Sequence, residues 1–137
     1  MKSTYLLIII TGLLITSKFQ VHAQAGTLDP TFGNGGKVTT NFLNSYDHGS
    51  YVAIQSDGKI LVSGYCFSGS NNDFALVRYN TDGSLDSTFG NGGKDTTDFG
   101  NTDDYGSGIT IQNDGKILMT GVKIGRASCR ERVSVLV

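Results

Sequence analysis

Two segments of this chain occur twice at the same spacing. Residues 57–61 (Asp-Gly-Lys-Ile-Leu) return unchanged at 114–118, and residues 32–37 (Phe-Gly-Asn-Gly-Gly-Lys) return at 89–94, so both have a period of 57 residues. Across the whole stretch from Leu28 to Gly64, about two thirds of the positions are identical in the second copy. A fixed period of this size indicates a repeat architecture, in which each copy is one supersecondary unit packed against its neighbours.

Within each period, the clearest strand pattern is a hairpin. Tyr51–Gln55 and Lys59–Tyr65 alternate in polarity around Ser56-Asp57-Gly58, where glycine supplies the left-handed residue that a short turn needs. The second copy repeats the design at Ile109–Val122, around Asp114-Gly115. The alternation predicts that one set of apolar side chains is largely buried, namely Val52, Ile54, Ile60 and Val62.

Three further stretches have strand-like alternation: Lys37–Phe42, Phe74–Asn80 and Lys94–Phe99. Each period therefore holds about four strands joined by turns, with no room for a helix. A four-stranded antiparallel unit at this spacing matches a β-propeller blade. We predict an all-β chain of about two incomplete blades; a parallel β-helix is the main competitor, but its coils are usually shorter and lack paired Asp-Gly hairpins.

The N-terminal residues 1–25 have the pattern of a secretory signal. Lys2 precedes an apolar run at Tyr5–Ile15, and Ala23 and Ala25 offer cleavage positions. A membrane anchor is the alternative, but a span needs about 18 apolar residues and Lys18 ends this run too soon. We expect a secreted or cell-surface protein whose mature chain has no membrane span.

The repeat region is acidic. From Gly26 to Lys123 there are six lysines and arginines against eleven aspartates, and no glutamate. Such a surface repels phosphate backbones, so nucleic acid is not an expected partner. The partner expected is a protein or a glycan that the sequence does not identify.

The repeated residues resemble the delta-60 repeat of secreted or surface bacterial proteins. The resemblance covers nearly everything from Leu28 to Lys123 and rests on three stretches in order: Leu28-Asp29-x-Thr31-Phe32-Gly33-x-Gly35-Gly36-Lys37, Ile54-Gln55-x-Asp57-Gly58-Lys59-Ile60-Leu61-Val62-x-Gly64 and Asp73-Phe74-Ala75-Leu76-Val77-Arg78-Tyr79-x-x-Asp82-Gly83-Ser84-Leu85-Asp86. It implies propeller-like tandem copies, here 26–84 and a truncated 85–123, and brings no catalytic residues.

Two glycine- or acid-rich motifs suggest ligands, and each has a simpler explanation. Gly33–Gly36 could cradle a phosphate only if a helix followed, whereas Lys37 opens a strand pattern. Asn80-x-Asp82-Gly83-x-x-Asp86 is similar to part of a calcium loop, but an EF-hand register would put Arg78 and Phe89 at ligand positions. We assign no metal, cofactor or catalytic residues.

Histidine and cysteine offer equally little chemistry. His48 has Tyr105 as its counterpart, and nothing at a useful spacing would make it a general base. Cys66 corresponds to Lys123, so the repeat does not require a thiol; a half-buried small side chain is the expectation.

Two functional classes remain. The first is a non-catalytic scaffold or interaction module; the alternative is an extracellular polymer hydrolase whose site lies mostly in blades outside this sequence. A hydrolase needs loop carboxylates that break the repeat, whereas a scaffold's acids recur in register. Aspartates do recur, at Asp29/Asp86, Asp47/Asp104 and Asp57/Asp114, which favours the scaffold.

The last residues differ in composition from the repeats. Residues 124–137 hold the sole glutamate, three of four arginines and Cys129, and Ile124–Val133 resembles a translated sequencing-library adapter. We expect this tail to be non-native. Alternating Val133, Val135 and Val137 nevertheless predict a strand at Glu131–Val137, which by the period stands where Phe74–Asn80 stands in the first copy.

Overall fold

The computed structural model describes residues 26–42 and 46–125, and the backbone of 130–136; the expected signal segment lies outside this range. These residues form seven strands: β1 (Asp47–Ile54), β2 (Ile60–Phe67), β3 (Asn72–Tyr79), β4 (Lys94–Thr97), β5 (Asp104–Ile111), β6 (Ile117–Ile124) and β7 (Arg130–Leu136). The all-β prediction is confirmed, since these ranges contain no helix. It follows that no helix within them could cross a membrane.

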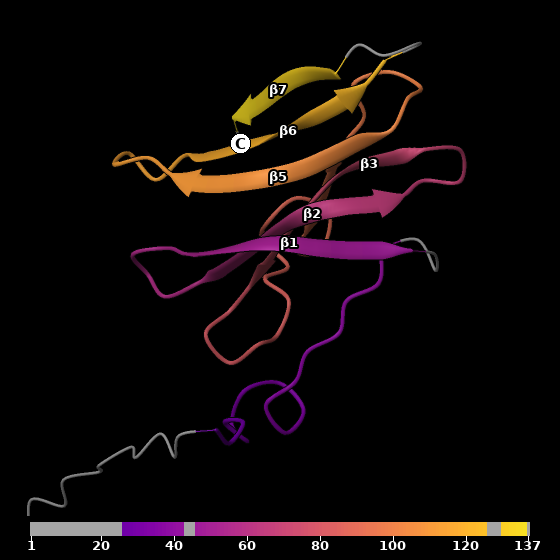
Figure 1. The fold of residues 1–137 in the computed structure, drawn as a ribbon. Helices are drawn as coiled ribbons and strands as arrows, with labels where there is room; N and C mark the ends of the chain where they lie inside the picture. The colour runs from indigo at the N-terminus through magenta and orange to yellow at the C-terminus, as the bar shows by residue number, and fades with distance from the viewer. Residues whose placement is uncertain (1–25, 43–45, 126–129, 137) are drawn as a thin grey trace, which may run out of the picture.

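The first sheet has the topology of a propeller blade. Its strands are antiparallel and lie in the order β1-β2-β3-β4, so each strand pairs with the next one along the chain. Figure 1 shows β1, β2 and β3 side by side in this order. The outermost strand, β4, falls within the second sequence repeat, so the sequence repeat and the folded blade are out of phase by one strand.

The two predicted hairpins are confirmed, with their turns where the sequence placed them. The amide of Gln55 donates to the carbonyl of Lys59 over 2.8 Å, and Gln112 donates to Lys116 over 2.8 Å. Gly58 and Gly115 have φ angles of 84° and 85°, the left-handed region that favours glycine. The preceding aspartates each accept a hydrogen bond from the backbone two residues on, which stabilises the turn.

The second sheet repeats the first as far as β6. It contains β5-β6-β7, and a bulge between Gly106 and Gly108 reproduces the one between Gly49 and Tyr51. The strand expected at the chain end is present as β7, apart from Val137, which lies outside the described residues.

The position of β7 differs from the prediction by one residue. Gly121 pairs with Val133, whereas Gly64, one period earlier, pairs with Ala75. The period alone would put Val133 where Leu76 stands. The connection before β7 is one residue longer than its counterpart before β3, which produces this difference.

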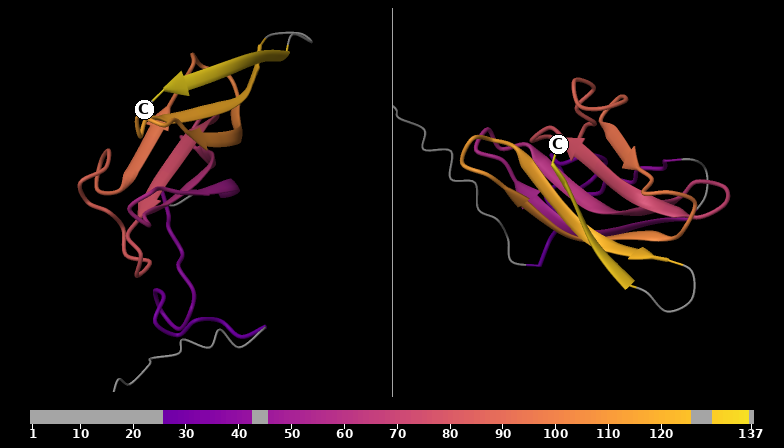
Figure 2. Two further views of the ribbon diagram at one scale, coloured as in Figure 1. Left: turned by 90° about the vertical axis from the view of Figure 1, so that its left-hand side faces the viewer. Right: turned by 90° about the horizontal axis from the view of Figure 1, so that it is seen from above.

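The core lies between the two sheets. Leu61, Phe74 and Leu76 of the first sheet are buried against Ile117 and Met119 of the second. Figures 1 and 2 show the sheets stacked, with β5 running along the first sheet. This face-to-face stacking is the contact that neighbouring propeller blades make, and the chain is a partial β-propeller.

The predicted burial of one hairpin face is wrong in the first copy. Val52 and Ile54 are 66% and 69% exposed, and Ile60 and Val62 are half-buried. The alternation is real, but these side chains lie on the face of the first sheet that points away from the second. We call this surface, formed by Val52, Ile54, Ile60, Val62, Ala75, Val77 and Tyr79, the outer face.

The predicted strand at Lys37–Phe42 is also wrong. The segment makes only an isolated bridge between Gly33 and Lys37, although Val38, Thr40 and Phe42 alternate in burial as a strand would. Its counterpart, β4, pairs with β3 of the blade before it in sequence. Lys37–Phe42 has no such edge within the described residues, and a strand without a partner cannot form its ladder.

Candidate functional site

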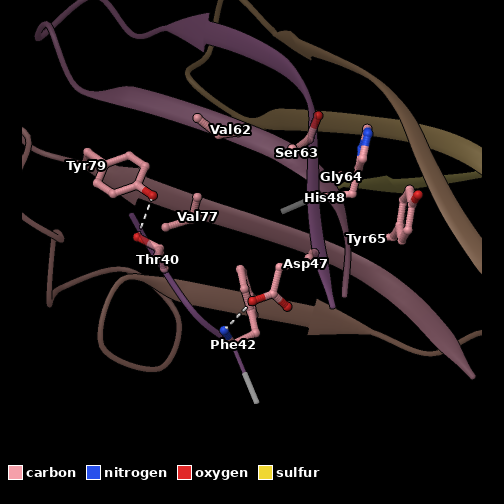
Figure 3. A pocket seen from close by; sticks show the side chains of 12 residues that line it. Thr40, Phe42, Asp47, His48, Val62, Ser63, Gly64, Tyr65, Val77 and Tyr79 are labelled. Atoms are coloured by element: carbon pink, nitrogen blue, oxygen red, sulfur yellow. Dashed lines mark hydrogen bonds between the residues drawn. The ribbon is translucent and has the colours of Figure 1, made fainter. Parts of the chain in front are cut away.

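A shallow pocket lies on the outer face, where the N-terminal segment crosses it. The hydroxyls of Thr40 and Tyr79 are 2.6 Å apart, and the amide of Phe42 donates to Asp47 Oδ2 over 3.0 Å (Figure 3). Sheet residues including Val62 and Val77 line the floor. The pocket measures about 160 Å³, below the roughly 300–1,000 Å³ typical of small-molecule sites. Its size suits protruding side chains of a protein surface better than a whole ligand.

The polar groups at this pocket are not arranged for catalysis. His48 stacks on Tyr65, with ring centroids 5.0 Å apart, and its Nδ1 lies 3.3 Å from the hydroxyl of Ser50. In the described part of the chain, His48 forms no hydrogen bond with a carboxylate that would orient it as a base. His48 lies in β1 and is exposed, at the position that Tyr105 takes one period later.

Asp86 forms the best-connected polar site, and it joins the two sequence repeats. Its Oδ2 accepts Lys59 Nζ over 2.8 Å and Arg78 Nε over 2.7 Å, while its Oδ1 accepts the amide and hydroxyl of Thr88. The carboxylate is buried, and the Arg78 guanidinium lies 4.5 Å from the centre of the Phe89 ring. Asp86 opens the second repeat and both cations belong to the first. We call Lys59, Arg78 and Asp86 the ion triad.

The ion triad predicts acid sensitivity. The hydrogen bond from Lys59, and next that from the Thr88 hydroxyl, holds the pKa of Asp86 well below its usual 3.8. Because the folded-state pKa lies below the unfolded one, the stabilisation is fully present above the unfolded pKa and is lost as the pH falls below about 3.8. We expect Asp86→Asn to lower the melting temperature near neutral pH and to flatten its decline in acid, measured by circular dichroism.

The matched control is Asp114→Asn. Asp114 also pairs with a lysine, Lys116, over 2.8 Å, but both side chains are more than half exposed. Exposed ion pairs contribute little, so this variant should melt almost like the parent. Equal losses in the two variants would contradict a special contribution from the ion triad.

The two ligand motifs weighed in the sequence are turns in the structure. At Gly33–Gly36 the amides of Asn34 and Gly36 donate to carbonyls of the chain itself, so they are not free to cradle an anion. Asp82 accepts the amide and hydroxyl of Ser84, and Asp86 is occupied by the ion triad. Neither aspartate is presented to a common calcium ion.

Cys66 is fully buried rather than half-buried. Burial, and next the negative charge of Asp47, raises the pKa of its thiol to about 11. A thiol that stays protonated at neutral pH is a poor nucleophile. Cys129 lies outside the described residues.

Sequence reasoning missed one cluster, in the seam between the sheets. Asp73, Asp98 and Asp104 each place a carboxylate oxygen within 4.8 Å of the others. The three residues come from the start of β3, the end of the β4 segment and the start of β5. No local spacing links them, so only the register of blade against blade could have found them.

The comparison with known families identifies the central part of the chain. Residues 55–89, from the end of β1 through β2 and β3 to the start of the second repeat, match a domain of unknown function, DUF5122, described as a β-propeller. No curated protein and no solved structure matches the chain. The matched residues include β2, β3 and the ion triad, and they are similar to a β-propeller repeat of unknown function.

Proposed function

We propose that the protein is an exported, non-catalytic scaffold whose blades assemble by stacking sheet faces, in the manner of delta-60 repeats. The observation that carries this proposal is that equivalent apolar side chains are packed against a neighbouring sheet in the second copy but not in the first. Ile109, Ile111, Ile117 and Met119 of the second copy pack against the core of the first blade. Within the described residues no second sheet covers their counterparts on the outer face: Val52 and Ile54 are exposed, and Ile60 and Val62 are half-buried.

The repeat itself therefore specifies what the outer face fits. Its partner is a sheet face of the kind that Leu61, Phe74 and Leu76 present to the second blade. Val52 and Ile54 leave large apolar side chains exposed at one edge of this face, and exposed apolar surface is characteristic of interaction sites. Export is supported by the basic, apolar and small-residue pattern of residues 1–25.

The aspartates that recur in register support a scaffold over a hydrolase. Asp57 and Asp114 cap hairpin turns, and Asp86 joins the repeats through the ion triad. Asp47 and Asp104 each accept the amide of a phenylalanine five residues earlier, Phe42 or Phe99. Each of these carboxylates accepts a hydrogen bond that holds the fold, from a backbone amide or from the cations of the ion triad, which favours a structural role for the recurring acids.

The test compares two double variants at equivalent positions. We expect the parent chain to self-associate or aggregate, and Val52→Ser with Ile54→Ser to shift it toward monomer with a stability change within about 0.5 kcal/mol, because both side chains are exposed. The control, Ile109→Ser with Ile111→Ser, should destabilise the fold by about 2 kcal/mol or more, because both pack on the core. Light scattering and denaturant unfolding measure the two effects.

Two results would contradict the proposal. One is a parent chain that is already monomeric and melts cooperatively, with no change in either property on adding the outer-face serines. The other is release of reducing ends from extracellular polysaccharides by the parent protein but not by a heat-denatured sample, which would favour the hydrolase instead.

A further inference from the structure

Three carboxylates converge in the seam between the blades. Asp73 lies in β3 of the first sheet, Asp98 follows β4, and Asp104 begins β5 of the second sheet. One carboxylate oxygen of each lies within 4.8 Å of the other two. Asp73 and Asp104 are buried, whereas Asp98 is exposed and leaves the cluster open to solvent on one side.

Asp104 has an oxygen that nothing in the described protein satisfies. The residue is fully buried; its Oδ2 accepts the amide of Phe99 over 2.8 Å, and its Oδ1 has no hydrogen-bond donor. The hydroxyl of Thr102, two residues earlier, is likewise buried without a partner. A buried oxygen without a donor costs stability, and such atoms in native proteins commonly face an ordered water or ion.

The charge of the cluster is also poorly balanced. None of the three carboxylates takes part in an ion pair among the described residues. Lys123, which pairs with Asp104 across β5 and β6, donates its ammonium hydrogen bond to the carbonyl of Phe99 and forms no ion pair with the three carboxylates.

We propose that Asp73, Asp98 and Asp104 bind a calcium ion that bridges the two blades. Asp104, whose Oδ1 is buried without a donor, contributes an oxygen to this cluster, and carboxylate oxygens are the ligands that hard divalent cations prefer. Calcium takes six to eight oxygens in flexible geometry, so water can complete its shell on the open side at Asp98. Magnesium requires a near-ideal octahedron and fits such an irregular set less well.

The first copy provides an internal comparison. Asp47 repeats the geometry of Asp104: its Oδ2 accepts the amide of Phe42 and its Oδ1 lacks a partner. There, however, the residue equivalent to Asp98 is Asn41, and Asp47 lines the pocket on the outer face rather than a seam between two sheets. The sequence change from Asn41 to Asp98 adds a charged oxygen at the seam that holds two blades together.

Calcium titration of the purified chain tests the site. After the protein has been treated with a chelator, we expect calorimetry to show heat of calcium binding that fits one site per chain. The site should be half-saturated at about 0.1–1 mM calcium, the range of extracellular calcium modules. We also expect the melting temperature to rise by about 5 °C or more at about 10 mM calcium, but not at equal magnesium. A rise of equal size with magnesium would indicate general charge screening and overturn the proposal.

Asp98→Asn is the decisive variant, because Asp98 is exposed and the first copy carries asparagine there. It should fold as the parent does without calcium and lose the binding heat and the calcium-dependent rise. Asp95→Asn removes the same charge from β4, outside the cluster, and should retain both. Absence of binding heat in the parent, or undiminished binding in Asp98→Asn, would overturn the proposal.

Discussion

Replacing Phe74 by alanine is expected to destabilise the two-sheet structure by about 3–5 kcal/mol, the usual cost of removing a buried phenylalanine. Its ring is 2% exposed and packs edge-on against Phe99, with centroids 5.1 Å apart. It also reaches across the seam to the position where Gly121 has no side chain. Domains of this size have only about 5–15 kcal/mol of stability in total, so the variant should be largely unfolded at moderate denaturant.

Phe42→Ala is the control for this prediction. Phe42 is the counterpart of Phe99, but it lies half-buried beside the outer face, where Lys94 Nζ sits 5.6 Å from its ring centre. Its removal should cost less than about 1 kcal/mol. Urea unfolding followed by tyrosine fluorescence measures both variants, and equal losses would show that the core does not lie between the sheets.

Gly106→Ala is expected to destabilise the protein by about 1–3 kcal/mol or more, because it forces a methyl group into a closed interface. A Cβ at this position would overlap the carbonyl oxygen of Gly64 in the first blade and the end of the Met119 side chain. The methionine can move, but the backbone carbonyl cannot without shifting the blades apart. Thermal unfolding should show the loss directly.

Gly49→Ala tests whether that loss comes from blade stacking. Gly49 holds the same bulge position one period earlier, but a Cβ there would meet only a methyl group of Val62, at 3.1 Å. Small rotations can relieve this contact, and the lower chain entropy of alanine in the unfolded state offsets part of the cost. We expect the free energy of unfolding to change by no more than about 1 kcal/mol. A loss as large as that of Gly106→Ala would show that the strain arises within each bulge and not where the two blades meet.

Local chemistry made much of the fold predictable. A glycine in the left-handed region closes each hairpin, so Gly58 and Gly115 revealed the turns without any tertiary information. The alternation of apolar residues likewise located β2, β3 and β6 to within about two residues, whereas β5 begins five residues before the predicted Ile109. These features depend on neighbours in sequence, which is why they could be derived from it.

What the sequence left open depends on neighbours in space. Alternation shows that Val52 and Ile54 share a face. It cannot show that, among the described residues, the second sheet packs on the opposite face and leaves these two side chains exposed. It also cannot supply Lys37–Phe42 with the strand it needs as a partner, nor detect that β7 pairs one residue out of step. The carboxylates of Asp73 and Asp104 meet only because two sheets stack in one register.

The offset between sequence repeat and folded blade has a consequence for how such a chain can change its length. Because β4 lies in the repeat after the one that supplies β1, β2 and β3, the first sheet straddles a repeat boundary, as would each interior sheet of a longer array built in the same way. Unequal crossing-over between copies removes or inserts 57 residues at once, and the new neighbour then supplies the missing outer strand. Wherever within the repeat the crossover falls, each interior sheet keeps four strands. The number of repeats can therefore change during evolution without producing an incomplete sheet between two complete ones.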